Sequence, residues 1–563
     1  MIELLWVLLL LSPLFLLALN FYNTSIKQKI VFCAVFYVIL YANMGYSLQL
    51  LKIPINVFSV FSAIMIIDTL LLYYLLKNNK LENIKNWNYK NIKISKIDIA
   101  LSIIILFSFF LYYYDQSKSF SLLHPDSWYW FSGSNFIMDN RFLFNENISY
   151  DYDVMHWYPD GFHYLWGITF LPFSSTLSYN AVKLIAPLFG VLTLVGLWEY
   201  FSEHKSYVIL VSIIYFISIP NLIDRFSMFL PESSGIFMIV FTGLVLKKYE
   251  FNKNIILIIG VVTGLFTNIY HSTGLIIFFI FGIIVVISKH NLKKYLFYYL
   301  LGAIFFFIPF ILDPKGFLTY NSHIVEVKVY PSLWNTWIKE SGIIFYANPS
   351  AKYTAIRAPI LGFPLSFMYL SLFFRKRFFD KSILFSLFLL IFSFLLGISY
   401  YLYETIFSAR SFVIFSISSV LLLPSFIMLM QEIFNKHFKN KSKKILYIFL
   451  ILLLINRALI FSFTYPSYKN DYIEEKSLMI LWIDDNVPIE STIVIEKDFT
   501  FGEYPLNIES HVERILYPRE TIFGEGNYTI NKNTYYLCYD DSLVERGIVH
   551  KETGLVLVKL GDN

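Results

Sequence analysis

The stretch Ser411–Met430, SFVIFSISSVLLLPSFIMLM, has twenty residues and no charged side chain. A helix of that length spans the roughly 30 Å hydrocarbon core of a bilayer. Ile30–Leu51 and Ile383–Tyr403 have the same apolar, uncharged character. Only 15% of the chain is charged, whereas soluble domains carry about 25% charged residues. The sequence therefore predicts a polytopic α-helical membrane protein.

The hydrophobic pattern predicts about fourteen spans. We place them at 2–20, 30–48, 54–76, 99–115, 179–201, 206–223, 233–247, 255–270, 272–288, 295–312, 358–374, 382–400, 411–433 and 445–464. Gly161–Phe173 is apolar but too short to span, so we expect a helix on the membrane surface there.

The lysines predict which loops face the cytoplasm. The loop Lys77–Asp98 has six lysines and only two acids, and basic residues are enriched in cytoplasmic loops. Counting spans from that loop places every later basic cluster on the same side, including Lys436–Lys444. The loops 116–178, 224–232 and 313–356 and the tail after residue 465 then lie outside. We expect a multi-pass protein of the cell membrane with these parts extracytoplasmic.

The remaining composition excludes several classes of protein. The net charge is +5, but the lysines lie beside hydrophobic segments, which argues against a nucleic-acid groove. Cys33 and Cys538 lie in a predicted span and in the tail, so neither a disulfide framework nor a cysteine zinc site is expected. Met1–Tyr22 lacks a basic start and a small-residue cleavage site, and we interpret it as a retained first span.

Three regions follow from this pattern. Residues 1–98 hold three spans and the basic loop, and residues 99–465 hold the remaining spans with the outer loops. Residues 466–563 differ in composition and predict a small α/β domain, which is within the usual size range. In it we expect a helix over Ser477–Asp485 and strands over Ser491–Ile495, Tyr535–Tyr539 and Leu555–Leu560.

The first candidate for chemistry is Asp126, in the outer loop that follows the fourth span. The local sequence is His124-Pro125-Asp126-Ser127. Pro125 ends any incoming helix, and Asp126 or Ser127 can cap a helix over Ser127–Met138. The cap is the simpler interpretation. The functional one is a general base held at the membrane surface.

A second outer motif lies between the sixth and seventh spans. It holds Arg225, Ser227 and Glu232, and Glu232 follows Pro231 at a predicted helix start. A carboxylate there stabilises the helix dipole. An ionisable group that faces the bundle at a span boundary is costly, so it is also a functional candidate.

Further candidates are more isolated in the sequence. Glu326 lies in His323-Ile324-Val325-Glu326, which alone resembles a solvated strand. Arg410, at the outer end of a late span, is either a snorkelling anchor or a phosphate ligand. His271 stands at the outer start of span 272–288. Asp153 and His156 lie in an acidic, aromatic run that suits either a cation site or an interfacial belt.

In this order and on this side, the motifs resemble those of the GT-C superfamily of membrane glycosyltransferases, most closely the catalytic subunit of oligosaccharyltransferases. The resemblance covers roughly residues 99–465. It implies that Asp126 is the catalytic aspartate of the first outer loop and that Arg410 contacts the lipid-linked phosphate. Glu232 matches the first acid of the family's acidic pair, seven residues after Arg225. Glu326 matches the glutamate of its mobile outer loop, and a divalent cation such as Mg²⁺ or Mn²⁺ would lie between these carboxylates.

Two features depart from the family pattern. Ser234 stands where the second acid of the pair is expected. The tail lacks the W-W-D-Y-G element that reads a peptide acceptor, and has Glu496-Lys497-Asp498-Phe499-Thr500 near the corresponding place. The resemblance therefore predicts a metal site that lacks one acid, and an acceptor other than a peptide sequon.

The resulting expectation is an enzyme that moves a sugar or oligosaccharide from a polyprenyl phosphate or pyrophosphate to a protein or glycan acceptor at the outer membrane face. Its expected partners are the lipid-linked donor and membrane lipid, and not nucleic acid. Two alternatives stay open. One is a transporter or flippase of lipid-linked saccharides, and the other is a non-catalytic binding protein on the same framework.

Overall fold

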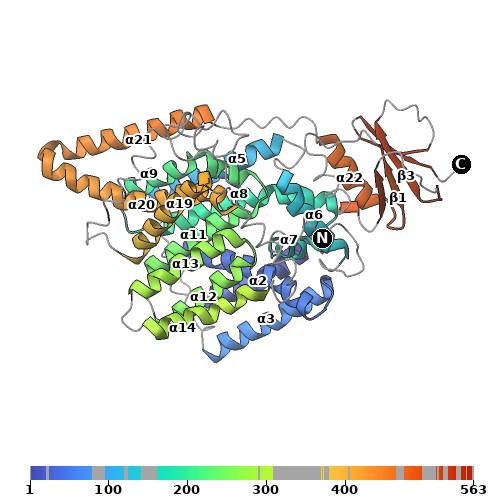
Figure 1. Cartoon of the computed structure of the whole chain (residues 1–563), viewed down its shortest axis with the longest axis horizontal. Coiled ribbons are helices and arrows are strands. Elements are labelled where there is room, and N and C mark those ends of the chain that lie inside the picture. Colours follow the sequence, from blue (N-terminus) through green and yellow to red (C-terminus); the bar gives the residue numbers. More distant parts are fainter. Residues whose placement is uncertain are drawn as a thin grey trace.

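The computed structural model describes most of the helical core and the sheet of the tail. The described residues are 2–20, 24–78, 95–118, 125–140, 161–250, 252–288, 292–308, 369, 372, 380–402, 406–464, 474–496, 515–516, 519–523, 530–539, 547–552 and 554–560. They form a bundle of helices with a small sheet domain at one end (Figure 1).

Helices occupy the predicted spans wherever the chain is described. They are α1 (Ile2–Asn20), α2 (Ile26–Leu50), α3 (Val57–Lys77), α5 (Lys96–Lys118), α8 (Ser175–Tyr200), α9 (Ser206–Ile217), α11 (Pro231–Lys248), α12 (Lys253–Thr267), α13 (His271–Ser288), α14 (Leu292–Ala303), α19 (Lys381–Leu402), α20 (Ile406–Phe438) and α21 (Ser442–Thr464). The predicted span 358–374 lies outside the described residues, except for Tyr369 and Leu372.

Six helices within the described residues are long and apolar enough to cross a membrane: α1, α2, α3, α5, α8 and α20. The membrane class and the helical fold are therefore confirmed. The count of about fourteen spans stays a prediction, because several other apolar helices are shorter than the length applied to these six.

Two predicted spans are not continuous α-helices. The span 206–223 is broken after Ile217, and α10 (Pro220–Ser227) begins at Pro220. Proline at the first helical position lacks an N–H and restricts the residue before it, so α9 cannot continue through it. In the span 295–312, α14 ends at Ala303 and the 3₁₀ helix η3 (Ile304–Phe307) follows, while residues 309–312 lie outside the described part.

The order of contacts shows which helices run in the same direction. Gly190 of α8 lies beside Phe226, Gly196 lies beside Val240, and Lys247 donates to the carbonyl of Tyr200 at 2.7 Å. Residue numbers therefore rise together along α8 and α11. Both helices begin at the end of the bundle that carries α6 (Pro125–Asn140) and α7 (Gly161–Phe170), which we call the outer end.

The tail folds as the predicted α/β domain. Helix α22 (Glu474–Asn486) precedes β1 (Thr492–Ile495), β2 (Glu520–Phe523), β3 (Thr534–Tyr539), β4 (Ile548–Glu552) and β5 (Leu555–Lys559), in the sheet order β2-β1-β3-β5-β4. β1 pairs in parallel with β2 and β3, and β5 pairs antiparallel with β3 and β4. The predicted helix and three strands are confirmed, whereas the edge strands β2 and β4 were not anticipated.

Candidate functional site

The outer end of the bundle is covered by a layer of aromatic side chains. The ring of Trp130 on α6 meets Phe162 on α7 edge-on at 5.3 Å, and Phe162 in turn packs against Phe229 at 5.2 Å. Every residue of α7 is buried. The short apolar segment predicted to lie on the membrane surface is thus a helix packed into this layer, between α6 and the segment that joins α10 to α11.

Asp126 is the second residue of α6, which starts at Pro125. The prediction that Asp126 or Ser127 caps a helix starting at Ser127 is therefore wrong: both residues lie inside the first turn. Proline at the first helical position has a backbone angle that already suits the helix, and this explains the earlier start. A carboxylate in a first turn is still favoured by the helix dipole. The side chain of Asp126 lies outside the described part.

Arg225 and Glu232 are brought together by the break between α10 and α11. Arg225 is in the last turn of α10, Glu232 is in the first turn of α11, and Nη1 lies 4.0 Å from Oε1. The side chain of Glu232 is 4% exposed and that of Arg225 is 25% exposed. Pro220 and Pro231, each at a helix start, fix the two helices on either side of the pair.

Ser234 does not take the place of a second acid. Its hydroxyl donates to the carbonyl of Pro231 at 2.6 Å, inside its own helix. Within the described residues, no group of three or more His, Cys, Asp or Glu side chains could hold a metal ion. Of the proposed metal ligands Asp126, Glu232 and Glu326, only the side chain of Glu232 is described, and it faces the guanidinium of Arg225. Glu326 lies outside the described residues, as do Asp153 and His156.

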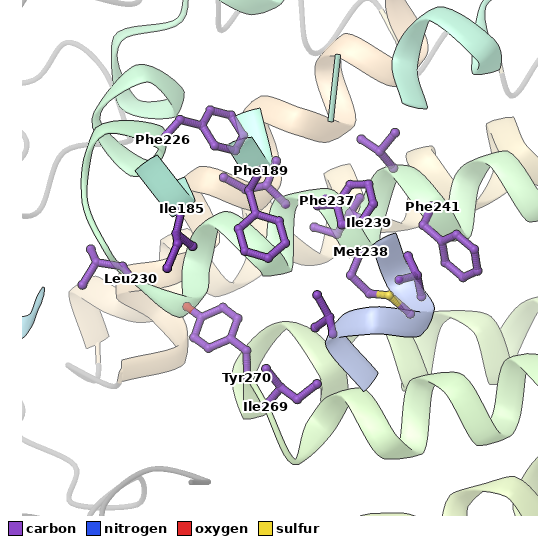
Figure 2. Close-up of a cluster of buried hydrophobic side chains, with 14 of the residues drawn as sticks. Ile185, Phe189, Phe226, Leu230, Phe237, Met238, Ile239, Phe241, Ile269 and Tyr270 are labelled. Atoms are coloured by element: carbon purple, nitrogen blue, oxygen red, sulfur yellow. The ribbon is translucent and has the colours of Figure 1, made fainter. Parts of the chain in front are cut away.

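The start of α13 packs beside the start of α11. A Cβ placed on Gly235 would lie 2.7 Å from the ring of Tyr270 and 2.9 Å from Thr273 Oγ1. Glycine at 235 therefore permits the two helix starts to approach. Figure 2 shows Tyr270 near Leu230 and the α8 side chains Ile185 and Phe189. His271 is the first residue of α13, next to Tyr270, and its side chain is not described.

The start of α7 joins the same region through a backbone bond. The N–H of Gly161 donates to the carbonyl of Asn268 at 3.0 Å, and a Cβ at Gly161 would lie 2.3 Å from that oxygen. Asn268 follows the last residue of α12, and its side-chain amide N–H donates a hydrogen bond to Oδ1 of Asn43 on α2 at 3.1 Å. Four helices, α2, α7, α12 and α13, therefore meet at this point of the outer end.

Arg410 lies at the level of Glu232, as the register of α20 against α11 shows. α20 runs in the same direction as α11, because Tyr207 at the inner start of α9 donates to Gln431 near the inner end of α20 at 3.1 Å. A Cβ on Gly243 of α11 would lie 3.8 Å from Leu421 Cδ1 of α20. Glu232 precedes Gly243 by eleven residues, and Arg410 precedes Leu421 by the same number. Both are thus about 16 Å outward from this contact.

Three buried hydrogen-bond donors of the outer half lack an acceptor in the described part of the chain. They are the hydroxyls of Tyr112 on α5 and Ser127 on α6, and the indole N–H of Trp166 on α7. Tyr112 packs on Phe226 at 5.2 Å and Trp166 packs on Phe229 at 6.1 Å, so both border the α10–α11 segment. Buried donors are normally satisfied, and these three point to an acceptor that the described residues do not supply.

Two acids of the tail bind the outer end of α8, which the sequence did not indicate. Asp485 accepts from the N–H of Ser175 at 2.8 Å and from the hydroxyl of Thr176 at 2.6 Å. Asp484 accepts from Ser175 Oγ and, at 3.2 Å, from the amide of Asn135 on α6. This contact joins the tail to the helix that carries Asp126, so the tail lies on the same side of the bundle as α6 and α7.

Asp484 also binds a residue of the tail itself. Arg519 forms an ion pair with Asp484 Oδ1 at 2.9 Å and donates to the carbonyl of Val487 at 2.7 Å. Burial raises the pKa of the Asp484 carboxyl, while the bonds from Ser175 and Arg519 oppose that rise. No local pattern in the sequence indicates this role, because Ser175, Asn135 and Arg519 are each more than thirty residues from Asp484 in the chain.

A further carboxylate lies in the middle of a membrane helix. Asp68 is near the centre of α3 and accepts from Ser12 of α1 at 2.5 Å. Ser12 also contacts the carbonyl of Leu9 at 2.8 Å. Pro13 has no N–H to donate to that carbonyl, which leaves it available. The pair thus joins α1 to α3.

No protein-family model and no curated protein matches the chain. Among solved structures, it is similar to an Archaeoglobus fulgidus oligosaccharyltransferase tethered to an acceptor peptide with the NVT sequon. Identity is 13% and the TM-score is 0.41, over 78% of this chain and 68% of the other. It is also similar to ArnT from Cupriavidus metallidurans bound to undecaprenyl phosphate. There identity is 8% and the TM-score is 0.47, over 82% of this chain and 97% of the other.

Proposed function

We propose that this chain is a membrane glycosyltransferase that moves a sugar or oligosaccharide from a polyprenyl phosphate or pyrophosphate to an acceptor at the outer end of the bundle. The observation that carries the proposal is the buried ion pair of Arg225 and Glu232. It lies between the end of α10 and the start of α11. We assign Arg410, in the first turns of α20, to the same site. Charges held at that depth are costly and are typically functional.

The reaction is a displacement at the anomeric carbon of the donor sugar. An acceptor oxygen forms a bond to that carbon while the bond from carbon to the phosphate oxygen breaks. We assign Asp126 the role of general base, which takes the acceptor's proton, and Arg410 the role of stabilising the departing phosphate. The lipid tail of such a donor lies in the bilayer, and its headgroup reaches the surface at which α6 begins.

The orphaned donors of Tyr112, Ser127 and Trp166 support a ligand rich in oxygen acceptors. Sugar hydroxyls and phosphate oxygens are such acceptors. A divalent cation such as Mg²⁺ or Mn²⁺, held by Glu232 and Glu326 with Asp126, would supply further positive charge to the leaving phosphate. Arg225, which faces Glu232 at 4.0 Å, would add positive charge at the same place.

The test compares two substitutions on one helix. Asp126→Ala should abolish movement of labelled saccharide from the lipid-linked to the lipid-free fraction in membranes that contain the chain. Asp139→Ala makes the same change near the other end of α6 and should leave transfer intact. Equal amounts of inserted protein are verified by detergent extraction and size-exclusion chromatography. If the Asp126→Ala chain still transfers saccharide, Asp126 is not the general base.

The same experiment separates the transporter alternative. A transporter is expected to carry charge near the middle of the membrane, and Asp68 is such a group. Its carboxylate is bound to Ser12 between α1 and α3. A transporter would move intact lipid-linked saccharide across the membrane and release none from its lipid, whether or not Asp126 is present.

A further inference from the structure

A lysine-rich hairpin joins α20 to α21 at the inner end of the bundle. α20 ends at Phe438, the 3₁₀ turn η7 (Lys439–Lys441) follows, and α21 begins at Ser442. Lys439 has φ 40, in the left-handed region that side chains other than glycine rarely adopt. The chain therefore reverses within three residues, and the lysines on both sides of the turn come close together.

The charge of this hairpin is unbalanced. Its lysines are all exposed, and none of them forms an ion pair within the described residues: Lys436, Lys439, Lys441, Lys443 and Lys444. The sequence from residue 433 to residue 470 contains no Asp or Glu. Elsewhere at the inner end, by contrast, Lys247 and Lys248 are paired with Glu203 and Glu199. Among the residues that the structure describes, the five lysines of the hairpin therefore have no acidic side chain paired with them.

The helix that follows, α21, exposes a stripe of apolar side chains. Along α21, the exposed apolar side chains recur at helical spacing on one side: Tyr447, Ile448, Ile451, Leu452 and Ile455. This stripe begins one turn after Lys443, so the lysines lie just before its first apolar residue. In a spanning helix that position is the level of the lipid headgroups. Tyr207 of α9 holds the hairpin in place through its ring contact with Tyr447 at 6.1 Å.

We propose that the hairpin 436–444 is a binding site for the headgroups of anionic phospholipids. Charge complementarity and depth in the membrane select this ligand: five lysines stand at headgroup level, directly beyond a lipid-facing stripe. Clusters of four to eight basic residues beside a spanning helix bind anionic lipids through these forces. The site is independent of the reaction proposed for the outer end, because it lies at the opposite end of α20.

The probe is the full-length chain in phosphatidylcholine vesicles that contain a trace of spin-labelled phosphatidylglycerol or spin-labelled phosphatidylcholine. We expect the immobilised fraction of phosphatidylglycerol to exceed that of phosphatidylcholine about threefold at low salt. The preference should disappear at about 1 M salt, where the screening length is short.

Three variants make the result specific. Replacement of the five hairpin lysines by Gln should abolish the preference, and replacement by Arg should keep it. The matched control replaces Lys77, Lys80, Lys85, Lys90 and Lys93 by Gln, which removes the same charge from another loop of the same predicted side. The proposal is overturned if the hairpin Gln variant keeps the preference. It is also overturned if the control variant loses as much as the hairpin variant does, because the effect would then be one of total charge.

Discussion

A carboxylate as buried as that of Glu232 is stable as an anion only beside positive charge, since desolvation disfavours the charged form. Arg225 supplies that charge at 4.0 Å, and as a quarter-exposed group it keeps part of its own hydration. The ion pair therefore stabilises the charged form of Glu232 more than it stabilises Arg225. Loss of Arg225 removes positive charge from beside a buried carboxylate, whereas loss of Glu232 leaves an arginine that can still reach water.

This asymmetry gives a prediction at the residue scale. Arg225→Met should lower the free energy of unfolding by about 2–4 kcal/mol, and Glu232→Gln by about 1–2 kcal/mol, because only the first leaves a buried carboxylate without the guanidinium that faces it. Thermal unfolding in detergent measures both. Glu250→Gln, an exposed acid just beyond α11, is the control and should change little. Equal losses for the two substitutions would contradict the account.

Single residues were the least predictable part of the site. The seven-residue spacing of Arg225 and Glu232 placed both at the outer end, but that they form an ion pair depends on the break before Pro231, which spacing alone does not show. Asp126 was expected to cap a helix and lies inside one. Asp484 and Asp68 were not anticipated, since their partners are distant in the sequence.

At the scale of elements, Asp485 acts as an N-terminal cap supplied by another domain. It accepts from the backbone N–H groups of Ser175 and Thr176, while Ser174, the residue before α8, accepts from Leu177. The free backbone N–H groups in the first turn of α8 thus find acceptors partly in Ser174, next to the helix, and partly in the tail. A cap typically contributes about 1 kcal/mol, and here that free energy also docks the tail.

The corresponding prediction concerns the docking of the tail. Asp485→Ala should make the tail about five times more sensitive to limited proteolysis, which corresponds to loss of one cap. Glu490 is an exposed acid of the same domain, and among the described residues it makes no hydrogen bond or ion pair with α8. Glu490→Ala should therefore leave the rate of cleavage unchanged. Unchanged cleavage of the Asp485→Ala chain would show that the apolar contacts of α22 dock the tail unaided.

Helices were more predictable than strands. A span needs about twenty apolar residues, and that length is visible without any knowledge of neighbours. β4, with the sequence IVHKE, alternates poorly and lies at the sheet edge, where only β5 fixes it as a strand. β1 is buried on both faces and was predicted, because four consecutive apolar or β-branched residues indicate a central strand.

At the scale of the whole molecule, the prediction is one of sidedness. α6, α7 and the tail share one end, and the hairpin 436–444 lies at the other. In a chain with Cys33→Ser and Cys538→Ser, Glu490→Cys should react with a membrane-impermeant maleimide on intact cells. Lys441→Cys should react only after the cells are permeabilised. The reverse pattern would invert the orientation that the lysines predict.

The contact between the tail and α8 also has a consequence for biogenesis. The ribosome makes Ser175 more than three hundred residues before Asp484 and Asp485. Until those residues emerge, the start of α8 and the amide of Asn135 lack their partners. The outer end therefore matures last, after all the membrane helices have been synthesised, and a chain truncated within the tail would be inserted but unfinished.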